Sequence, residues 1–568
     1  MPLKYPKDYN KEIRYCGSMN SYEDSLIIGE NQFELLVNVY HDGSKLRKRP
    51  PHKRIHWSDP ASGTKTGVWM PKGMGVYRTA AATYVVWATA QGKLWRTLSD
   101  GTSLAEITLA SANALTAGNF CDLCQYFGDF YAADQVKFLE LNVTAATAAN
   151  LTAGLSAPSA TGITAPYKMA YYQFRLALCD RTGRTALTQQ EADISVDADP
   201  WKFTGAGATG FINPIASGDG KQISGIAVNN TTLVFNKMSS QPEEYLGGTF
   251  KMTGSSQDDF AVKEISSILG YLGTSGQSIG SRLFGLTHSG FQYLNTVESL
   301  GTDTSSGAVN SEKVVSAFQQ NVIPEFIKDK LKLLNINFAE QVAGIYSPRE
   351  HAYYCSFPYQ VSEWNNLTVR IDFTNNDIRM SFFTNTDAQY FCYMNGFVHF
   401  IDRKGTIWRM MDHDQTTYEE EEFTTIIMSK KFAMNDTREY GNIRSFVPEI
   451  QIEGANKTLK LFYHTFTTDT ATRVVNRSTD RKGISATVGD YKLIKELSFY
   501  PNRWDNLIFD MDNYDYQHFD TFHPELQVNV NCDYSQFLLI DQCQDTDGTK
   551  GWNFMGYKVK GSSAGESL

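Results

Sequence analysis

The clearest strand-forming pattern of the chain is Tyr84-Val85-Val86-Trp87-Ala88-Thr89-Ala90-Gln91-Gly92-Lys93-Leu94-Trp95. Two short runs of aromatic and aliphatic residues flank a polar turn that contains a glycine, which is the pattern of a β-hairpin. Aromatic and β-branched side chains favour the pleated, half-buried surface of a sheet. The stretch therefore predicts two antiparallel strands joined by a short turn.

The hairpin pattern recurs along the chain. Six further copies follow the first, at steps that vary from about 42 to 69 residues and average about 52; the copies lie near residues 84, 126, 172, 233, 283, 353 and 397. A four-stranded propeller blade needs roughly 40–50 residues, so the spacing favours an all-β chain with a β-propeller of six to eight irregular blades. On spacing alone, unrelated hairpins in two or three sandwiches remain an equal alternative.

Three domains are expected. Residues 1–60 form an N-terminal segment that closes or flanks the propeller, and residues 61–410 form the propeller itself. Two segments poor in large apolar residues, 142–166 and 203–221, are expected to be inserted arms. Residues 411–568 form a C-terminal domain resembling a β-sandwich, and the few helices are short, with candidates near residues 31–36 and 324–334.

Composition excludes several classes of protein. The chain has 568 residues, 13% of them aromatic, and a formal net charge of −10. An acidic protein does not grip nucleic acid over its whole surface, although an acidic wall suits DNA that slides past it. No apolar stretch is long enough to span a bilayer and the first residues do not form a secretory signal, so folding in a cytoplasm is expected.

No catalytic, cofactor or metal site is expected. The phosphate-binding pattern GxxxxGK[ST] and the zinc pattern HExxH are both absent. The eight cysteines are scattered, which predicts reduced, buried thiols. Cys121 and Cys124 form a lone CxxC without the second pair of ligands that a structural zinc site needs. The sequence therefore predicts that the protein is not an enzyme and carries no cofactor.

Two charged clusters are the candidate functional sites. A basic cluster interleaved with two prolines is a candidate interface or DNA contact, with a plain surface role equally open; its members are Lys45, Arg47, Lys48, Arg49, Lys53 and Arg54. An acidic run is a candidate channel lining or interface if the protein forms a closed ring, and otherwise a solvated strand end; its members are Glu419, Glu420, Glu421 and Glu422.

The N-terminal stretch resembles a known family. Gly17-Ser18-Met19-Asn20 is followed by Asn31-Gln32, by Asn38-Val39, and by the run from Asp42 to Pro50 that contains Leu46-Arg47-Lys48-Arg49. This order of motifs is similar to the opening of the tail nozzle proteins of short-tailed bacteriophages, also called packaged-DNA stabilisation or tubular tail proteins. Ser44-Lys45 separates Gly43 from Leu46, a slight departure from the family pattern.

The resemblance implies a structural protein of the virion tail. Such proteins form a ring, expected here to be a homohexamer, that is attached to the head-to-tail adaptor, retains packaged double-stranded DNA and conducts it during ejection. Tail fibre, needle or plug proteins are the further partners implied, and assembly would take place in the bacterial cytoplasm. The alternative function is a non-catalytic, lectin-like propeller module of a tail fibre that recognises host glycans.

Overall fold

The computed structural model describes most of the chain. The described residues are 8–23, 25–56, 70–110, 114–150, 163, 166–190, 211–215, 219–229, 232–239, 247–254, 259–280, 282–295, 317–319, 326–373, 378–412, 423–433, 441–453, 457–466, 492–499, 519–522, 526–532, 534–542 and 552–563. Most of these residues are in strands and very few are in helices, which confirms the predicted all-β class.

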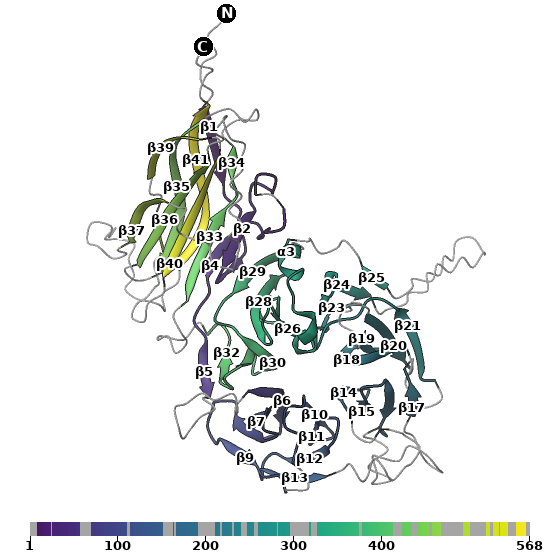
Figure 1. Ribbon diagram of the computed structural model, residues 1–568. Helices are drawn as coiled ribbons and strands as arrows, with labels where there is room; N and C mark the ends of the chain where they lie inside the picture. Colours follow the sequence, from purple (N-terminus) through teal and green to yellow (C-terminus); the bar gives the residue numbers. More distant parts are fainter. Residues whose placement is uncertain are drawn as a thin grey trace, which may run out of the picture.

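Seven blades of four antiparallel strands stand around one axis and form a β-propeller; six blades are separate sheets, and the four strands of blade six belong to a ten-stranded sheet (Figure 1). Blade one comprises β6 (Pro71–Arg78), β7 (Thr83–Thr89), β8 (Leu94–Leu98) and β9 (Ala105–Ile107). Blade two comprises β10 (Asp122–Tyr126), β11 (Asp129–Ala133), β12 (Phe138–Asn142) and β13 (Thr147–Asn150). Blade three comprises β14 (Lys168–Tyr172), β15 (Arg175–Cys179), β16 (Arg184–Leu187) and β17 (Phe211–Pro214).

The remaining four blades follow in chain order. Blade four comprises β18 (Lys221–Asn229), β19 (Thr232–Ser239), β20 (Gly247–Thr253) and β21 (Ala261–Ser266). Blade five comprises β22 (Gln277–Ile279), β23 (Arg282–Thr287), β24 (Gly290–Asn295) and β25 (Ala317–Gln319). Blade six comprises β26 (Ala343–Ser347), β27 (Ala352–Pro358), β28 (Asn365–Asp372) and β29 (Arg379–Phe383). Blade seven comprises β30 (Ala388–Met394), β31 (Phe397–Asp402), β32 (Ile407–Arg409) and β5 (Lys53–His56).

The first strand of each blade lies innermost, and these strands contact one another in order until β30 meets β6 and the ring is complete. Blade seven takes its outermost strand, β5, from the N-terminal segment, with His56 opposite Ile407. Strand pairing between distant parts of the chain therefore closes the circle and removes the open edges that a flat sheet would expose. The inner strands also approach closely, because a Cβ on Gly73 would lie only 1.8 Å from the carbonyl oxygen of Cys121.

Alternation within β7 holds neighbouring blades together. Tyr84, Val86 and Ala88 pack against blade two. Val85 and Trp87, which point the opposite way, pack against blade seven. A strand with both faces buried needs apolar residues at successive positions, which is why the opening hairpin is apolar throughout rather than alternating with polar residues.

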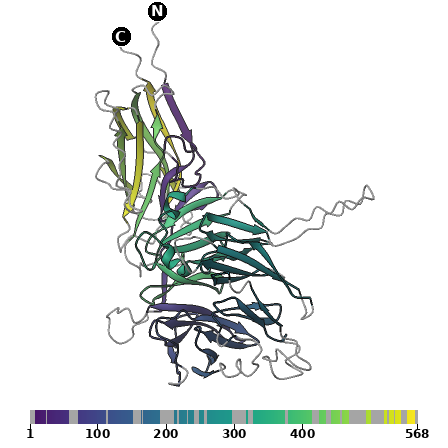
Figure 2. The same ribbon diagram turned by 45° about the vertical axis from the view of Figure 1, so that its right-hand side comes forward.

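A β-sandwich stands beside blade six (Figures 1 and 2). One sheet contains β1 (Asp8–Ile13), β3 (Val39–Asp42), β4 (Lys45–Lys48), β35 (Gly441–Glu453), β38 (Phe519–Phe522), β39 (Leu526–Cys532) and β41 (Trp552–Ser563). The other contains β2 (Phe33–Val37), β33 (Thr424–Ser429), β34 (Phe432–Ala433), β36 (Lys457–Phe466), β37 (Lys492–Phe499) and β40 (Tyr534–Gln542). The N-terminal segment thus supplies four strands to a domain expected from residues 411–568 alone.

The sandwich core continues into the propeller. Phe33 of β2 meets Phe554 of the opposite sheet at 6.2 Å between ring centroids, and Phe446 stacks on Phe537 at 4.0 Å. The same hydrophobic cluster includes Phe284 of blade five and Tyr353 of blade six. Strand β2 also pairs with β29, so the sheet of blade six runs on into the sandwich. The two domains therefore share one core.

Three local expectations are corrected. Residues 31–36 do not form a helical turn, because β2 begins at Phe33 and fills the space between β29 and β33. The expected arms at 142–166 and 203–221 contain β13 and β17, the outer strands of blades two and three. β13 consists of small residues without a clear apolar pattern, and the expected arms otherwise lie largely outside the described residues. The helices described are short: α3 (Lys328–Leu331) and the 3-10 helix η4 (Ile336–Gln341).

The shared core generates a prediction about unfolding. Replacing Phe33, which is fully buried, by Ala removes a large side chain where both domains pack, so we expect a loss of about 3–5 kcal/mol in unfolding free energy. Calorimetry of the Phe33→Ala variant should show one transition at a lower temperature. Ile27, 72% exposed, offers the matched control, and Ile27→Ala should leave that temperature unchanged. Separate transitions for propeller and sandwich would contradict a shared core.

Candidate functional site

The predicted basic cluster lies where the N-terminal segment passes from the sandwich to the propeller. Lys45, Arg47 and Lys48 belong to β4, and Lys53 and Arg54 belong to β5. The cluster is therefore spread over two domains instead of forming one patch. Its members differ in exposure, and this difference decides which of them another molecule can reach.

Lys48 is buried and ion-paired inside the protein. Its Nζ lies 3.4 Å from Oδ2 of Asp541, and both side chains are almost fully buried. The indole Nε1 of Trp552 donates a hydrogen bond of 2.8 Å to the same carboxylate oxygen. The prediction of an interface or DNA contact is wrong for Lys48, because its charge is already matched by a carboxylate from the distant strand β40.

Arg49 is also buried, with none of its surface exposed. Its guanidinium donates to Oδ1 of Asn38 at 3.0 Å and to the carbonyl oxygen of Thr384 at 3.3 Å, and it lies over the ring of Phe423 at 3.7 Å. These partners come from β29's C-terminal side, from the N-terminal segment and from the start of β33. Arg49 therefore ties three chain segments together, and the predicted external contact is wrong for it as well.

The other four cations are partly exposed. Arg47 lies 3.3 Å from Asp42 of the same hairpin, and Lys45 donates to the side chain of Gln451 at 3.5 Å. Lys53 and Arg54 are half-buried on the outer strand of blade seven. An interface role stays a prediction for these four. The acidic run Glu419 to Glu422 lies outside the described residues.

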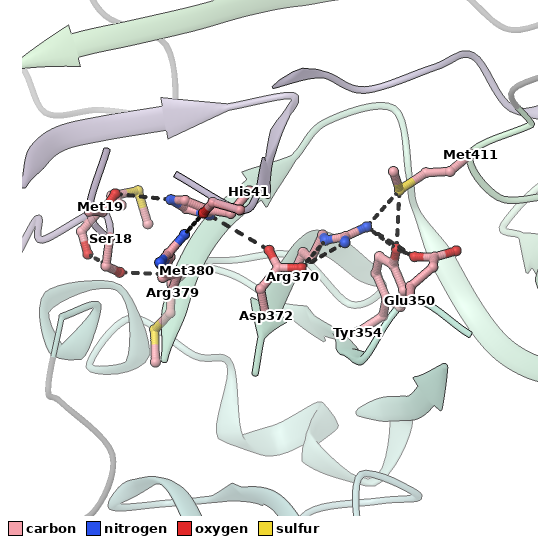
Figure 3. A network of polar contacts seen from close by, with 12 residues as sticks. Ser18, Met19, His41, Glu350, Tyr354, Arg370, Asp372, Arg379, Met380 and Met411 are labelled. Atoms are coloured by element: carbon pink, nitrogen blue, oxygen red, sulfur yellow. Dashed lines mark hydrogen bonds and ion pairs between the residues drawn. The ribbon is translucent and has the colours of Figure 1, made fainter. Parts of the chain in front are cut away.

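A buried polar network joins blade six to the N-terminal segment (Figure 3). His41 Nε2 is 2.9 Å from the carbonyl oxygen of Gly17, and His41 Nδ1 is 3.6 Å from Asp372 Oδ2. Arg370 donates to Asp372 at 2.6 Å and to Glu350 at 3.0 Å. The network runs from the N-terminal segment, through the outer part of blade six, to the turn that carries Glu350.

Electrostatics hold the central pair of this network in its charged form. Burial alone would raise the pKa of the Asp372 carboxyl, but Arg370 and His41 outweigh burial and hold the pKa below its ordinary value. Ser18 and Arg379 extend the same junction: Ser18 Oγ accepts from the amide of Met380 at 2.9 Å, and Arg379 bonds the carbonyl oxygen of Gly43. The junction is thus a specific, charged joint.

A second set of polar side chains lies at the end of the propeller where the innermost strands begin, here called the start face. Its members, here called the axial cluster, are Tyr167, Arg181, Gln222 and Glu340. The carboxylate of Glu340, in η4 before blade six, forms a 2.7 Å ion pair with Arg181 of blade three. It also accepts a 3.3 Å hydrogen bond from Tyr167 Oη. Arg181 also bonds Gln222 of blade four. Blades three and six are not neighbours in a ring of seven, so these contacts cross the axis.

Buried ionisable groups surround this axial cluster. Burial raises the pKa of Asp122 despite the nearby Lys168, and burial and neighbouring phenols and acids raise the pKa of Tyr390. The side chains of the cluster bond one another across the mouth. These contacts join blades three and four to the η4 segment before blade six.

Cys121 and Cys124 do not converge. Cys121 packs in the cluster between blades one and two, whereas Cys124 packs against the cluster between blades two and three. Successive strand positions face opposite sides of a sheet, so two cysteines three residues apart on one strand point away from each other. Among the residues the structure describes, six cysteines are free thiols and no group of three metal-ligating side chains occurs.

Sequence reasoning missed the residues that build both polar clusters. His41, Arg370 and Asp372 come together only through strand pairing between distant segments, and no spacing in the sequence announces them. Glu340 was likewise unmarked, since its partners in blade three lie far away in sequence. The one local signal was the density of cations after Gly43, which marked the joint but not its buried character.

Comparisons with known proteins add no family. No family model matches the chain, and no curated protein matches it. In the described part of the chain, no helix is long and apolar enough to cross a membrane.

Solved structures resemble it only distantly. BamB from Moraxella catarrhalis is 9% identical with a TM-score of 0.34, covering 72% of this chain and 99% of its own. YCF48 bound to D1 peptide is 10% identical with a TM-score of 0.37, and the match covers 66% of this chain and 99% of YCF48. BBS1N in complex with ARL6DN is 11% identical with a TM-score of 0.37, covering 64% and 98%.

The buried ion pair generates a prediction about stability. Replacing Lys48 by Met leaves the Asp541 carboxylate buried without its cation, so we expect unfolding free energy to fall by about 3–5 kcal/mol in urea denaturation. The double variant Lys48→Met with Asp541→Leu should recover part of the loss. Lys93 pairs with Glu106 at the surface, and Lys93→Gln should leave stability unchanged. Equal effects at Lys48 and Lys93 would contradict the structural role.

Buried histidines generate a prediction about pH. Burial lowers the pKa of His399 to about 4, whereas an unfolded histidine titrates near 6.5. The unfolded chain therefore binds a proton that the folded chain excludes, and stability contributed by neutral His399 is lost as pH falls from about 6.5 to 4. The loss is roughly 3 kcal/mol. The melting temperature of the His399→Gln variant should fall less steeply from pH 6.5 to pH 4 than that of the parent chain. An equally steep fall in both chains would contradict the low pKa of His399.

Proposed function

We propose that this chain is a structural subunit of the tail nozzle of a short-tailed phage. Several copies, expected to be six, would form a ring on the head-to-tail adaptor that retains packaged DNA and conducts it during ejection. The observation that carries the proposal is the place of residues 17–50, which resemble the opening of that family. This stretch supplies β2, β3 and β4 to the sandwich and leads directly into β5 of the propeller.

The rigid joint between the domains supports this role. A ring that holds DNA under pressure must transmit force between subunits without its domains turning against each other. The shared hydrophobic core, the Arg370–Asp372 pair and buried Arg49 all oppose such a rotation. A loose linker, which leaves domains free to move by default, is replaced here by a large apolar contact.

The axial cluster supports a lumen formed between subunits. Cross-axis contacts of Glu340 occupy the start face of the propeller, so DNA would pass along the axis of the assembled ring and not through one chain. The net charge of −10 suits a wall that repels phosphates and lets the duplex slide. Glu419 to Glu422 remain the candidate lining for that wall.

Assembly with an adaptor tests the proposal. The chain is co-expressed with the head-to-tail adaptor of a short-tailed phage, and the mass of the complexes is measured by mass photometry. We expect a ring of about six copies bound to the adaptor ring. A chain that stays monomeric and never joins the adaptor would overturn the proposal.

The partly exposed cations generate a sharper prediction. Replacing Arg47 and Arg54 by Gln should slow association with an acidic adaptor surface about tenfold and weaken its dependence on salt, because charges at the rim of an interface act mainly on association rate. Thermal stability should stay close to that of the parent chain. Lys93→Gln with Arg403→Gln, two exposed cations elsewhere on the propeller, is the matched control and should associate normally. Equal rates for both double variants would remove the role of the basic cluster.

A further inference from the structure

Blades two and three expose aromatic side chains where the innermost strands end, at the opposite end of the axis from the axial cluster. Phe127, Tyr171 and Phe174 are 44%, 42% and 61% exposed. Tyr126 is buried beside them and lies 6.3 Å from both Phe127 and Tyr171, measured between ring centroids. Tyr171 in turn meets Phe174 at 6.5 Å. These four residues form one continuous aromatic platform across two blades.

Both phenylalanines occupy unfavourable backbone positions. Phe127 has φ of 51° and Phe174 has φ of 61°, each in the two-residue turn of a hairpin. Turns of this kind need positive φ at both central residues, which Asn-Gly supplies best, and positive φ is costly for a bulky side chain. Blade seven makes the same turn with Asn395-Gly396, at φ of 53° and 81°. The chain thus uses the favourable residues in one blade and aromatic residues in two others.

Neither the exposed rings of Phe127 and Phe174 nor their positive φ angles add to the stability of the fold. An aromatic ring that lies in water contributes little burial, and a positive φ subtracts from stability, so neither fold nor core explains these two phenylalanines. Strained backbone with exposed side chains is typical of binding sites, where stability is given up for recognition. The platform is therefore a better candidate for a binding surface than the scattered exposed apolar residues elsewhere.

Carboxylates beside the platform restrict what it binds. Asp129 follows the Phe127 turn directly, and Glu140 lies opposite Tyr131 in the same blade. Burial raises the pKa of Glu140, and the neighbouring Asp129 raises it further. Two adjacent acidic groups repel phosphates, which disfavours a nucleic acid strand stacking on these rings. They accept hydrogen bonds readily, which suits a ligand rich in hydroxyl groups.

We propose that the exposed rings of the platform, Phe127, Tyr171 and Phe174, bind a neutral polysaccharide, while the buried Tyr126 packs against two of them. Sugar rings carry one apolar face of C–H groups that packs on an aromatic ring, while their hydroxyls remain available to donors and acceptors at the edge. Asp129 is placed to accept from such hydroxyls. This binding is independent of the nozzle role.

The Asn395-Gly396 turn of blade seven shows which residues to introduce in a variant that tests the proposal. Phe127→Asn combined with Phe174→Gly gives both turns residues that tolerate positive φ, so the melting temperature should rise or hold while polysaccharide binding falls at least tenfold. The probes are dextran, mixed-linkage β-glucan and galactomannan in affinity electrophoresis, with oligo(dT) as the nucleic acid probe. Val361→Asn, at a residue 93% exposed and outside the platform, is the matched control and should change neither quantity.

Each result of the affinity electrophoresis either supports or overturns polysaccharide binding. Retardation of the parent chain by one of the polysaccharides, lost in the double variant, supports the proposal. No retardation by any of them, equal retardation of the double variant, or retardation by oligo(dT) alone overturns it. A change in sedimentation of the double variant without any loss of sugar binding would show that the platform joins copies of this chain, which also overturns it. Ring formation on the adaptor, measured separately, reports on the nozzle role.

Discussion

Strand β2 ties the propeller to the sandwich by backbone pairing on both of its edges. It pairs with β33 of the sandwich on one side and with β29 of blade six on the other, and Phe33 at its start packs into the sandwich core. β2 links β33 to blade six within one sheet, and Phe33 belongs to the hydrophobic core that the two domains share. Because β3, β4 and β5 follow within twenty residues, the same segment also fixes where the propeller closes. The joint between the domains is therefore a property of the fold itself.

The charged residues follow from this constraint. A segment that enters two domains carries its polar groups into their interior, and buried charges must be matched there. Lys48 meets Asp541, Arg370 meets Asp372, and Arg49 meets carbonyl oxygens and a ring. Two of the six cations after Gly43, Lys48 and Arg49, thus serve the joint. The residues left for an external partner are the four at its margins.

Local patterns in the sequence predict what depends on near neighbours. The apolar run 84–88 predicted strands and, by repetition, the propeller, because each strand buries both faces against adjacent blades. Outer strands such as β13 were missed, since residues 147–150 are small and show no alternation of apolar and polar side chains. The burial of Arg49 was missed because its partners lie far along the chain. The aromatic platform had one visible sign, a phenylalanine where a two-residue turn favours Asn.

Pairing between the two ends of the chain has a consequence for how the protein is made. β5 is synthesised early, but its partner β32 is synthesised only after the first six blades. β1 likewise cannot pair until β41, the last described strand, has been synthesised. Pairings of such long range slow folding and leave sheet edges open meanwhile. The ribosome must release nearly the whole chain before the sandwich is complete. A product truncated before β41 would therefore lack the strand with which β1, β4 and β35 pair.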